Sequence, residues 1–401
     1  MKASQHPLRV MMIASMNAFE PRSGGELRVH HLARELARRG HRVHILAFVG
    51  RPYPTGRCQL APGLCAEQRH AWPLDGSLVA SRLGWVPPTE LPMWYRFLRG
   101  SVARAIRTAG PDVVEFHFPW HLPLYEAVPK HVPIIYASHN IESRYWKPVL
   151  ASFRLGRGFR RRLARYEIKA ARKADAVSVC SEAERNWLRR MAGLPVGRLC
   201  LVGNGYDASA THRISREDRR HVRERFGFGP EKKIALFVGS DTVHNRWAAR
   251  TIVNDIAPVL ADEPFHFVIV GTVGRAFDNQ APRANVFVTG PLEDVSPWFQ
   301  AADVGLNPVR SGSGTQLKMP EYLAAGLAVV TTPVGLRGYE ALRPWVLVRE
   351  PKAFAEAIRV AEWPNEVPTE QLEALTWAAS ACRLEQLYQR VLAGPTGREA
   401  G

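Results

Sequence analysis

The chain has 401 residues, of which 46% are hydrophobic and 23% charged, and its formal net charge is +17 at pH 7. This length exceeds what one hydrophobic core usually supports, so two domains are expected, and the composition excludes a disordered, collagenous or coiled-coil chain. No run approaches the roughly 18 apolar residues of a spanning helix, and the start does not read as a signal peptide. The five scattered cysteines indicate a reduced, cytoplasmic protein.

The first half is predicted to begin with a βαβ unit. A buried strand over 8–14 leads into a loop that contains Gly24 and Gly25, a helix is predicted over 26–39, and a second strand follows at 42–48. The parallel pair that this implies needs a crossover of about this length. Further strands are predicted at 113–116, 133–136 and 176–179.

The second half repeats this pattern. A strand over 233–238 leads through the Gly239-Ser240 loop into a helix over about 245–260, and a strand follows at 265–270. More strands are predicted at 286–288, 304–306 and 328–331. Two doubly wound α/β domains are therefore expected, and because such sheets bind ligands at the carboxyl ends of their strands, we expect the site in a central cleft that the domains face.

The predicted boundaries follow the changes in composition along the chain. They are 1–205 for an N-terminal Rossmann-like domain, 206–232 for a charged linker, 233–371 for a C-terminal Rossmann-like domain, 372–393 for a helix that packs back toward the first domain, and 394–401 for a tail. Neither half has G-x-G-x-x-G directly after its first strand, which argues against a dinucleotide-dependent dehydrogenase.

The segment 307–326 is the most indicative of chemistry. A strand ends near Leu306, a Gly/Ser/Thr loop follows, and a helix is expected to start around Thr315. Free backbone N–H groups at such a helix start suit an anion. Lys318 would lie one turn into the helix with Glu321 on the same face, which suits the phosphates and sugar hydroxyls of a nucleotide diphosphate. An ordinary glycine-rich turn beside a solvated Lys318–Glu321 pair is the alternative interpretation.

The segment 312–335 resembles the nucleotide-sugar segment of family-4 retaining glycosyltransferases, which are group 1 glycosyltransferases of the GT-B fold. The resemblance is to the branch whose loop reads Gly-Ser-Gly-Thr-x-Leu-Lys. Other matching motifs occur in the family's order, at 24–28, 138–142, 175–182, 202–207 and 237–240 with Asn245. The resemblance implies transfer of a hexose from a nucleotide diphosphate sugar, with retention of configuration.

The resemblance also assigns roles on the donor side. Glu321 would hold the ribose of the donor, whereas the family's other glutamate would fall at Ser313 and is absent. The catalytic role of this absent glutamate would be taken by backbone amides around Gly314 and Thr315. The phosphate-binding arginine would fall at Ser240 and the lysine near Asn245, and both are absent. Lys318 is the substitute we expect, with Arg246 as a helper.

On the acceptor side, His139 matches the histidine that lies against the transferred sugar, and Asn140 and Glu142 lie beside it in the sequence. His139 directly follows a predicted strand, which is a position where sites form. A loop histidine bonded to a backbone carbonyl is the alternative interpretation, and most of the fourteen histidines, including His117, are expected to be structural. The candidate catalytic residues are His139, Lys318 and Glu321. The candidate donor-binding residues are Gly24, Gly25, Gly239, Ser240, Gly312, Ser313, Gly314, Thr315, Lys318 and Glu321.

No metal or other cofactor is expected, because cationic and N–H donors could stabilise a departing diphosphate and no Asp-x-Asp motif occurs. Three alternatives to the transferase remain open: a nucleotide-sugar epimerase of the same fold, a catalytically weak nucleotide-binding protein, and a nucleic-acid-binding protein. Binding of nucleic acid is not expected, because the sequence has no recognisable reading module or stacking platform.

The positive charge is confined to one half of the chain. Residues 1–200 contain 32 lysines and arginines against 14 acidic residues, whereas residues 201–401 contain 22 against 23. The excess is densest over 144–173, with eleven basic residues and one acidic residue, Glu167. A basic amphipathic helix of this kind attracts anionic lipid, and a helix packed on its own domain with a solvated face is the alternative. We expect a membrane-associated glycan or lipid-linked acceptor, and a peripheral protein of polysaccharide biosynthesis.

Overall fold

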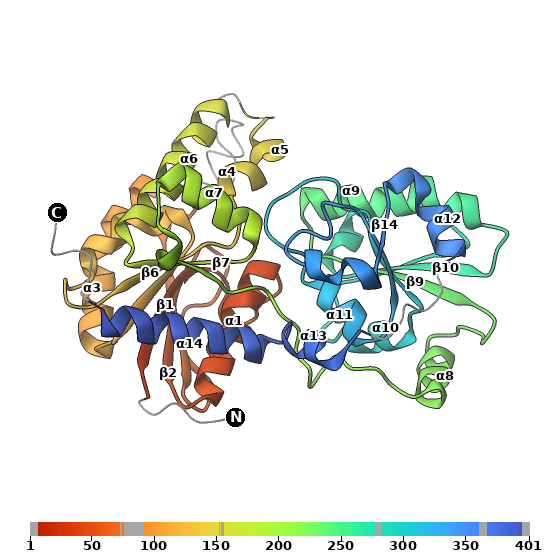
Figure 1. Ribbon diagram of the computed structural model, residues 1–401, viewed down its shortest axis with the longest axis horizontal. Coiled ribbons are helices and arrows are strands. Elements are labelled where there is room, and N and C mark those ends of the chain that lie inside the picture. The colour runs from red at the N-terminus through yellow and green to blue at the C-terminus, as the bar shows by residue number, and fades with distance from the viewer. Residues whose placement is uncertain are drawn as a thin grey trace. The chain divides into compact units, whose positions relative to one another are not determined.

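The computed structural model describes residues 7–72, 74–75, 92–151, 153, 156–277, 283–360 and 367–394. The chain forms two compact units (Figure 1). The first combines Met1–Gly203 with Trp377–Gly401, and the second is Asn204–Thr376. The second unit is therefore inserted between two parts of the first.

The first unit is built on an eight-stranded sheet in the order β3-β4-β2-β1-β5-β6-β7-β8, in which only the β3–β4 pair is antiparallel. The order reverses between β1 and β5, which defines a topological switch point. The strands are β1 (Arg9–Ser15), β2 (Arg42–Val49), β3 (Gly56–Ala61), β4 (Leu64–His70), β5 (Val113–His117), β6 (Ile134–Ala137), β7 (Ala176–Val179) and β8 (Leu199–Leu201).

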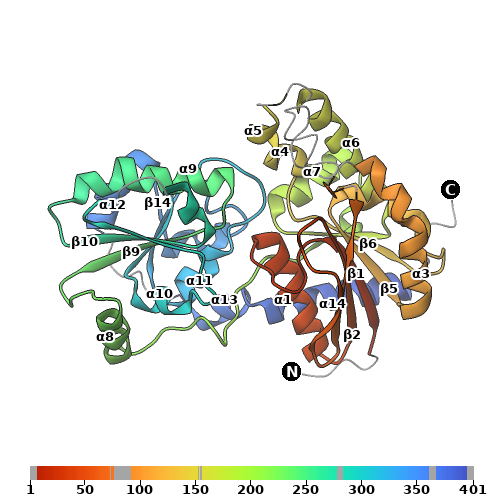
Figure 2. The same cartoon turned by 180° about the vertical axis from the view of Figure 1, so that it is seen from behind.

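Helices cover both faces of this sheet. Side chains of α3, η2 and α6 form one core with Met11 and Ile13 of β1. On the opposite face α1 packs against α14 (Figures 1 and 2). His31 and Trp377 stack there with ring centroids 5.2 Å apart. The helices are α1 (Gly24–Arg38), η1 (Pro92–Leu98), α3 (Arg99–Ala109), η2 (Pro119–Ala127), α4 (Glu142–Tyr145), α5 (Lys147–Leu150), α6 (Gly156–Lys173), α7 (Glu182–Ala192), η3 (Val196–Arg198) and α14 (Trp377–Ala393).

The second unit has a six-stranded parallel sheet in the order β11-β10-β9-β12-β13-β14, with its switch point between β9 and β12. The strands are β9 (Lys233–Val238), β10 (Phe265–Val270), β11 (Val286–Gly290), β12 (Val304–Asn307), β13 (Ala328–Thr331) and β14 (Leu347–Val348). The helices are α8 (Arg216–Arg225), α9 (Val243–Thr251), η4 (Ile252–Ile256), η5 (Ala257–Leu260), η6 (Thr272–Phe277), α10 (Ser296–Ala301), α11 (Lys318–Ala324), η7 (Glu340–Trp345), η8 (Pro351–Ala353), α12 (Phe354–Arg359) and α13 (Thr369–Glu373).

Tyr322 fixes α11 over this switch point. Its buried hydroxyl lies 3.1 Å from the carbonyl oxygen of Leu236 and accepts from the N–H of Val238 at 3.1 Å. Gly305 of β12 makes room for the ring, since a Cβ atom there would lie 2.4 Å from it. Because α11 is held against both strands of the switch point, the loop that precedes it opens at the carboxyl edge of the sheet.

Several element bounds differ from the sequence-based expectation. The first helix starts at Gly24 because Ser23 and Glu26 form a capping box. The helix expected from Thr315 begins only at Lys318. The expected linker contains α8, whose Arg223 forms an ion pair with Asp303.

The helix expected over 372–393 is also divided. Its first residues belong to the second unit, and α14 begins at Trp377 and belongs to the first.

Candidate functional site

The candidate donor site of the second unit lies at its switch point, where the loop after β12 makes two sharp turns. Gly312 and Gly314 have φ angles of 117° and 75°, which favour glycine. Arg337 donates to the carbonyl oxygen of Gly312 at 2.9 Å, and Asn204 donates to the hydroxyl of Thr315 at 2.7 Å. These contacts hold the loop through a carbonyl oxygen and a side-chain hydroxyl.

Lys318 is the buried cation of this site. Its side chain is 6% exposed, its Nζ donates to Asn245 Oδ1 at 3.3 Å, and the same Nζ lies 4.3 Å from the centre of the Phe237 ring. Burial lowers the pKa of Lys318 to about 7, although Glu321 opposes this shift. Burial likewise raises the pKa of the half-buried Glu321 carboxyl to about 7. An anion beside Lys318 would restore its charge.

Asn245 joins this loop to the loop after β9. Its amide donates to the carbonyl oxygen of Ser240 at 2.9 Å while its oxygen accepts from Lys318. Gly239 is packed against the same side chain, since a Cβ there would lie 3.1 Å from Asn245 Cγ. The structure therefore brings Gly239, Ser240 and Lys318 together, and Ser313 lies in the adjoining loop with 8% exposure.

Two arginines lie beside this site. Arg246, the expected helper, forms a bidentate ion pair with Asp241, with one of its contacts at 2.7 Å. This pair raises the pKa of Arg246 and lowers that of Asp241, so the guanidinium is already engaged at the surface. The exposed Arg310, which the sequence analysis did not single out, lies 4.1 Å from the centre of the Trp247 ring.

In the first unit, His139 and Gly25 lie together. His139 is 6% exposed, and a Cβ added to Gly25 would be 3.4 Å from its Nδ1. Gly25 and Gly24 start α1, after the switch-point strand β1. The Phe118 ring covers His139 with centroids 4.5 Å apart. Phe118 has a φ of 78°, which is uncommon for a residue with a side chain.

His139 is bonded to His117, a residue that sequence reasoning set aside. His117 Nδ1 lies 2.9 Å from His139 Nε2, and burial holds the pKa of both rings well below the usual range. His117 follows Glu115 by two residues in a strand that is otherwise apolar. Two polar side chains on one face of a buried strand are a signal that could have identified His117.

Asn140 and Glu142 interact with each other. Asn140 donates to Glu142 Oε1 at 3.1 Å and Trp146 donates to Oε2 at 3.1 Å. Glu142 is 3% exposed, and burial followed by the charge of Glu167 raises its pKa to about 8. The carboxyl group thus joins the residues on either side of α4, and Glu167 of α6 anchors the helix by accepting from the N–H of Ser143 at 3.1 Å.

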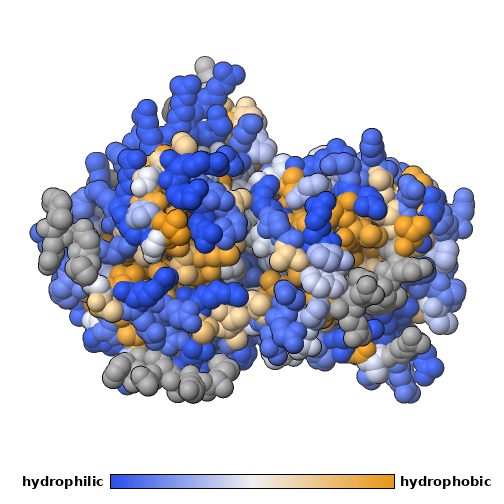
Figure 3. Space-filling model, viewed as in Figure 1, coloured by the Kyte–Doolittle hydropathy of each residue, from blue (hydrophilic) through white to orange (hydrophobic). Residues whose placement is uncertain are grey.

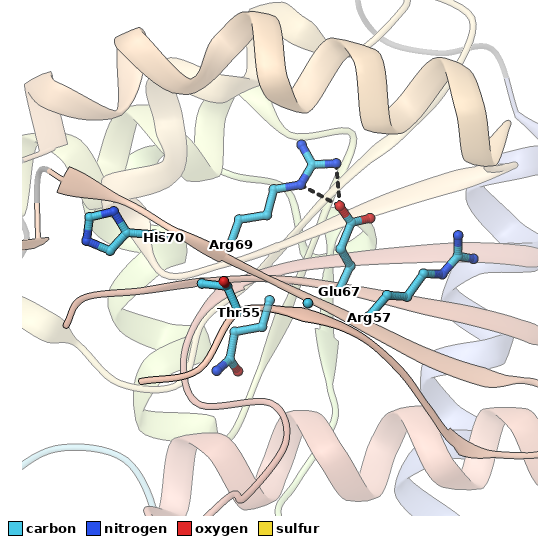
Figure 4. A pocket seen from close by; sticks show the side chains of 7 residues that line it. Thr55, Arg57, Glu67, Arg69 and His70 are labelled. Carbon is cyan, nitrogen blue, oxygen red and sulfur yellow. Dashed lines mark hydrogen bonds and ion pairs between the residues drawn. The ribbon is translucent and has the colours of Figure 1, made fainter. Parts of the chain in front are cut away.

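A surface pocket on the β3–β4 hairpin contains none of the predicted site residues (Figure 4). Arg69 pairs there with Glu67, donating to its Oε1 at 2.6 Å, and His70 contacts Asp75 at 2.6 Å. The lining residues are Thr55, Gly56, Arg57, Glu67, Gln68, Arg69 and His70.

Within the described ranges, no three or more His, Cys, Asp and Glu residues are grouped as a metal site would require. No helix in the same ranges has the length and apolar character needed to cross a membrane.

Residues 23–205 match the model of a glycosyl transferase 4-like domain, and residues 232–361 match that of glycosyl transferases group 1. The solved structure of sucrose-phosphate synthase from Thermosynechococcus elongatus is 17% identical with a TM-score of 0.73, covering 96% of this chain and 99% of its own. HepE from Anabaena in complex with UDP-glucose is 15% identical with a TM-score of 0.59, covering 96% and 98%. WaaG, a glycosyltransferase involved in lipopolysaccharide biosynthesis, is 17% identical with a TM-score of 0.61, covering 96% and 100%. No relative was found among the curated proteins.

The two Rossmann-like sheets and these neighbours define a protein of the two-domain GT-B fold. The two family matches together span most of the chain. The chain belongs to the group 1 glycosyltransferases, with a first domain of the glycosyl transferase 4-like kind, and it is a glycosyltransferase.

Proposed function

We propose that this enzyme transfers a hexose from a nucleoside diphosphate sugar to a membrane-associated glycan or lipid-linked acceptor, with retention of the anomeric configuration. The observation that carries the proposal is the loop at 311–317, which opens at a switch point beside the buried Lys318. HepE, a neighbour of the same fold, has been crystallised with UDP-glucose.

The donor diphosphate would be held by the N–H groups of this loop and by Lys318. Without an anion, Lys318 has an amide oxygen and an aromatic face as neighbours. The charge of Glu321 offsets the burial of this ammonium only in part. A phosphate would add negative charge beside it, and a charge-assisted hydrogen bond is among the stronger polar contacts. Glu321, one turn further along α11, would accept from the hydroxyls of the ribose.

Catalysis would rest on stabilising the leaving diphosphate. As the bond to the anomeric carbon breaks, negative charge grows on the phosphate oxygens, and donors fixed in advance favour that charge. Lys318 and the loop amides are held by Asn245, Arg337 and Asn204, so they need little rearrangement during the reaction. His139 of the first unit would contact the transferred sugar.

Thermal unfolding measured with UDP-, GDP- and dTDP-sugars tests donor binding, because a ligand of the native state raises its stability. We expect the sugar nucleotides of one of these bases to raise the melting temperature of the protein. Glu321→Gln should reduce stabilisation by that nucleoside diphosphate more than stabilisation by pyrophosphate. Equal losses would argue against the ribose role, and the absence of any stabilising nucleotide would count against the donor assignment. The anomeric signal of the product, compared with that of the donor, tests retention.

The membrane proposal rests on α6. Its apolar stripe packs into the core of the first unit through Phe159, Leu163 and Ala170, so these side chains are not available for insertion into lipid. The surface at α6 is mainly hydrophilic (Figure 3). Its exposed basic residues are Arg157, Arg160, Arg161, Arg162, Arg165, Lys169, Arg172 and Lys173. Attraction to anionic lipid would therefore be electrostatic, at about 1 kcal/mol per basic residue near the surface.

Sedimentation with liposomes tests this proposal. We expect the protein to sediment with vesicles that contain anionic lipid, to stay free with neutral vesicles, and to be released as salt rises, because the screening length is about 8–10 Å at physiological salt. Replacing Arg160, Arg161, Arg162 and Arg165 with glutamine should abolish sedimentation and leave nucleotide binding intact.

A matched control removes the same charge from the second unit by replacing the exposed Arg220, Arg225, Arg250 and Arg343 with glutamine. This variant should sediment like the wild type. If the wild type does not sediment with anionic vesicles at low salt, the acceptor is a soluble molecule. The basic residues of α6 then form only a solvent-exposed surface.

A further inference from the structure

Two aromatic side chains are exposed beside each other on the first unit. Trp72 is 49% exposed and Phe97 is 56% exposed, and their ring centroids lie 5.5 Å apart. The guanidinium carbon of the exposed Arg96 lies 4.8 Å from the centre of the Phe97 ring. Single exposed apolar side chains are ordinary, whereas a contiguous group bordered by charge is typical of an interaction site. We call Trp72, Arg96 and Phe97 the aromatic patch.

The aromatic patch lies at the carboxyl edge of the first sheet. Trp72 follows the end of β4, which runs parallel to β2. Phe97 belongs to η1, and the hydroxyl of Tyr95 in the same segment bonds at 2.7 Å to the hydroxyl of Ser15, the last residue of β1. In the loop after β2, Tyr53 is also 52% exposed. Three segments at one edge of the sheet therefore present aromatic rings to solvent.

The basic helix α6 starts at the same edge. It follows α4 and α5, which come after the carboxyl end of β6, and it ends shortly before β7 begins. On one face of the sheet, η2 packs against α6 and also against η1. The segment that contains Phe97 and the basic helix are thus joined through η2 within a single unit.

The charge on this side of the first unit is almost wholly positive. Among the acidic side chains that the structure describes between residues 92 and 173, Glu126 alone is exposed, and it pairs with Arg99. Besides the basic residues of α6, the exposed basic side chains of this segment are Arg96, Arg104, Arg107, Lys130, Arg144 and Lys147. Exposed rings within a positive surface complement an anionic bilayer, because the rings can enter the boundary between head groups and acyl chains while arginine contacts the phosphates.

The helix α6 cannot supply the apolar part of such a contact, because its apolar stripe is packed in the core of the first unit. One membrane-binding signal gives only weak and reversible attachment, and stable attachment takes two. We propose that Trp72 and Phe97, flanked by Arg96, insert into the head-group boundary of an anionic bilayer while α6 supplies the attraction to its charge. This inference rests on the membrane association in the proposed function, and it does not depend on the identity of the donor or the acceptor.

Quenching by brominated lipid tests the insertion, because bromine on the acyl chains quenches a tryptophan that enters the bilayer. The full-length protein is titrated with phosphatidylglycerol vesicles with and without bromine. We expect Trp72→Phe to reduce the quenching and still to sediment with the vesicles, since phenylalanine keeps an aromatic ring. Trp298→Phe is the control and should leave the quenching unchanged, because Trp298 stacks on Phe226 of the second unit with ring centroids 4.0 Å apart.

Sedimentation measures how much the aromatic patch contributes to binding. Trp72→Ser combined with Phe97→Ser should lower the partition into phosphatidylglycerol vesicles about tenfold. This factor should be the same at every salt concentration, because salt screens charges and leaves the apolar contact in place, whereas the effect of removing charge from α6 should shrink as salt rises. The matched control combines Phe287→Ser with Leu292→Ser, two side chains of the second unit that are each 41% exposed. It should partition like the wild type.

Equal quenching in the wild type and Trp72→Phe, or an unchanged partition of the double serine variant, would overturn the inference and leave salt-dependent binding through α6 intact. A wild type that does not bind anionic vesicles would refute the membrane association itself and the inference with it. Light scattering of the free protein tests a second copy of the chain as the occupant of the aromatic patch. We expect the same mass for the wild type and the double serine variant, and a dimer that the variant dissociates would assign the aromatic patch to a contact between copies and overturn the inference.

Discussion

The two units place opposite chemistry at the same topological position. At the switch point of the second sheet, the nearly neutral half of the chain buries Lys318 beside the glycine-rich loop at 311–317. At that of the first sheet, the strongly basic half places neutral histidines, His139 and His117, and exposes its basic residues on α6. The net charge of a domain therefore describes its surface and gives no measure of the charge inside its site.

Removal of Lys318 is expected to have the largest effect. Lys318→Ala should weaken binding of the nucleoside diphosphate about 10- to 100-fold, the cost of a charge-assisted hydrogen bond. Lys233→Ala is the control, because Lys233 also lies over an aromatic ring, Phe265, but at the opposite end of β9. Isothermal titration measures both. Equal losses in the two variants would contradict the assignment of Lys318 to the diphosphate site.

His139→Ala should lower turnover and leave the affinity for the donor diphosphate nearly unchanged. We expect kcat to fall about 10- to 50-fold, because a buried hydrogen bond to the sugar is lost, while the dissociation constant of the diphosphate stays within about twofold. The exposed His131 provides a control substitution. A variant with full turnover on its acceptor would leave His139 with a structural role alone.

The affinity for diphosphate should depend on pH through the protonation of Lys318. Its pKa of about 7 in the free protein means that it is charged below this pH and neutral above it, whereas bound phosphate favours the charged form. Affinity should therefore fall from pH 7 to pH 9, by at most about tenfold per pH unit. Lys318→Arg should flatten the slope since arginine stays charged, and a flat wild-type profile would contradict the assignment.

The smallest effect is expected at Arg246. Its ion pair with Asp241 lies at the surface, where such pairs contribute about 0–1 kcal/mol. Arg246→Ala should change diphosphate affinity less than about threefold. A loss as large as that of Lys318→Ala would show that Arg246 leaves Asp241 to bind phosphate, as the sequence-based hypothesis held.

Much of the fold could be predicted from the sequence, because apolar runs and helical periodicity mark the buried strands and crossovers. The β3–β4 hairpin could not, since most of β3 is exposed and its residues carry no alternation of core and surface. Within the site, the glycines and Lys318 could be selected from their pattern. The contacts made by Asn245 and His117 could not, because they join side chains 73 and 22 residues apart.

The start of α11 illustrates the same limit. A Gly/Ser/Thr run after a strand predicted a helix from Thr315, yet left-handed turns at Gly312 and Gly314 and the bond from Asn204 to Thr315 keep the segment as a loop. The anion-binding groups would thus belong to loop backbone. Sequence pattern identified the segment, while tertiary contacts set its conformation.

The return of α14 to the first unit has a consequence for biosynthesis. Val29 and Leu36 are buried residues of α1, which packs with α14 over one face of the first sheet. Tyr388 of α14 donates a hydrogen bond to the buried Glu115. These partners leave the ribosome almost two hundred residues after β8, once the whole second unit has been made. The first unit is therefore completed last although its sheet is translated first. A chain that stops before Trp377 would leave Glu115 without its Tyr388 partner and α1 without α14, so the first unit is finished only in molecules whose synthesis has passed through α14.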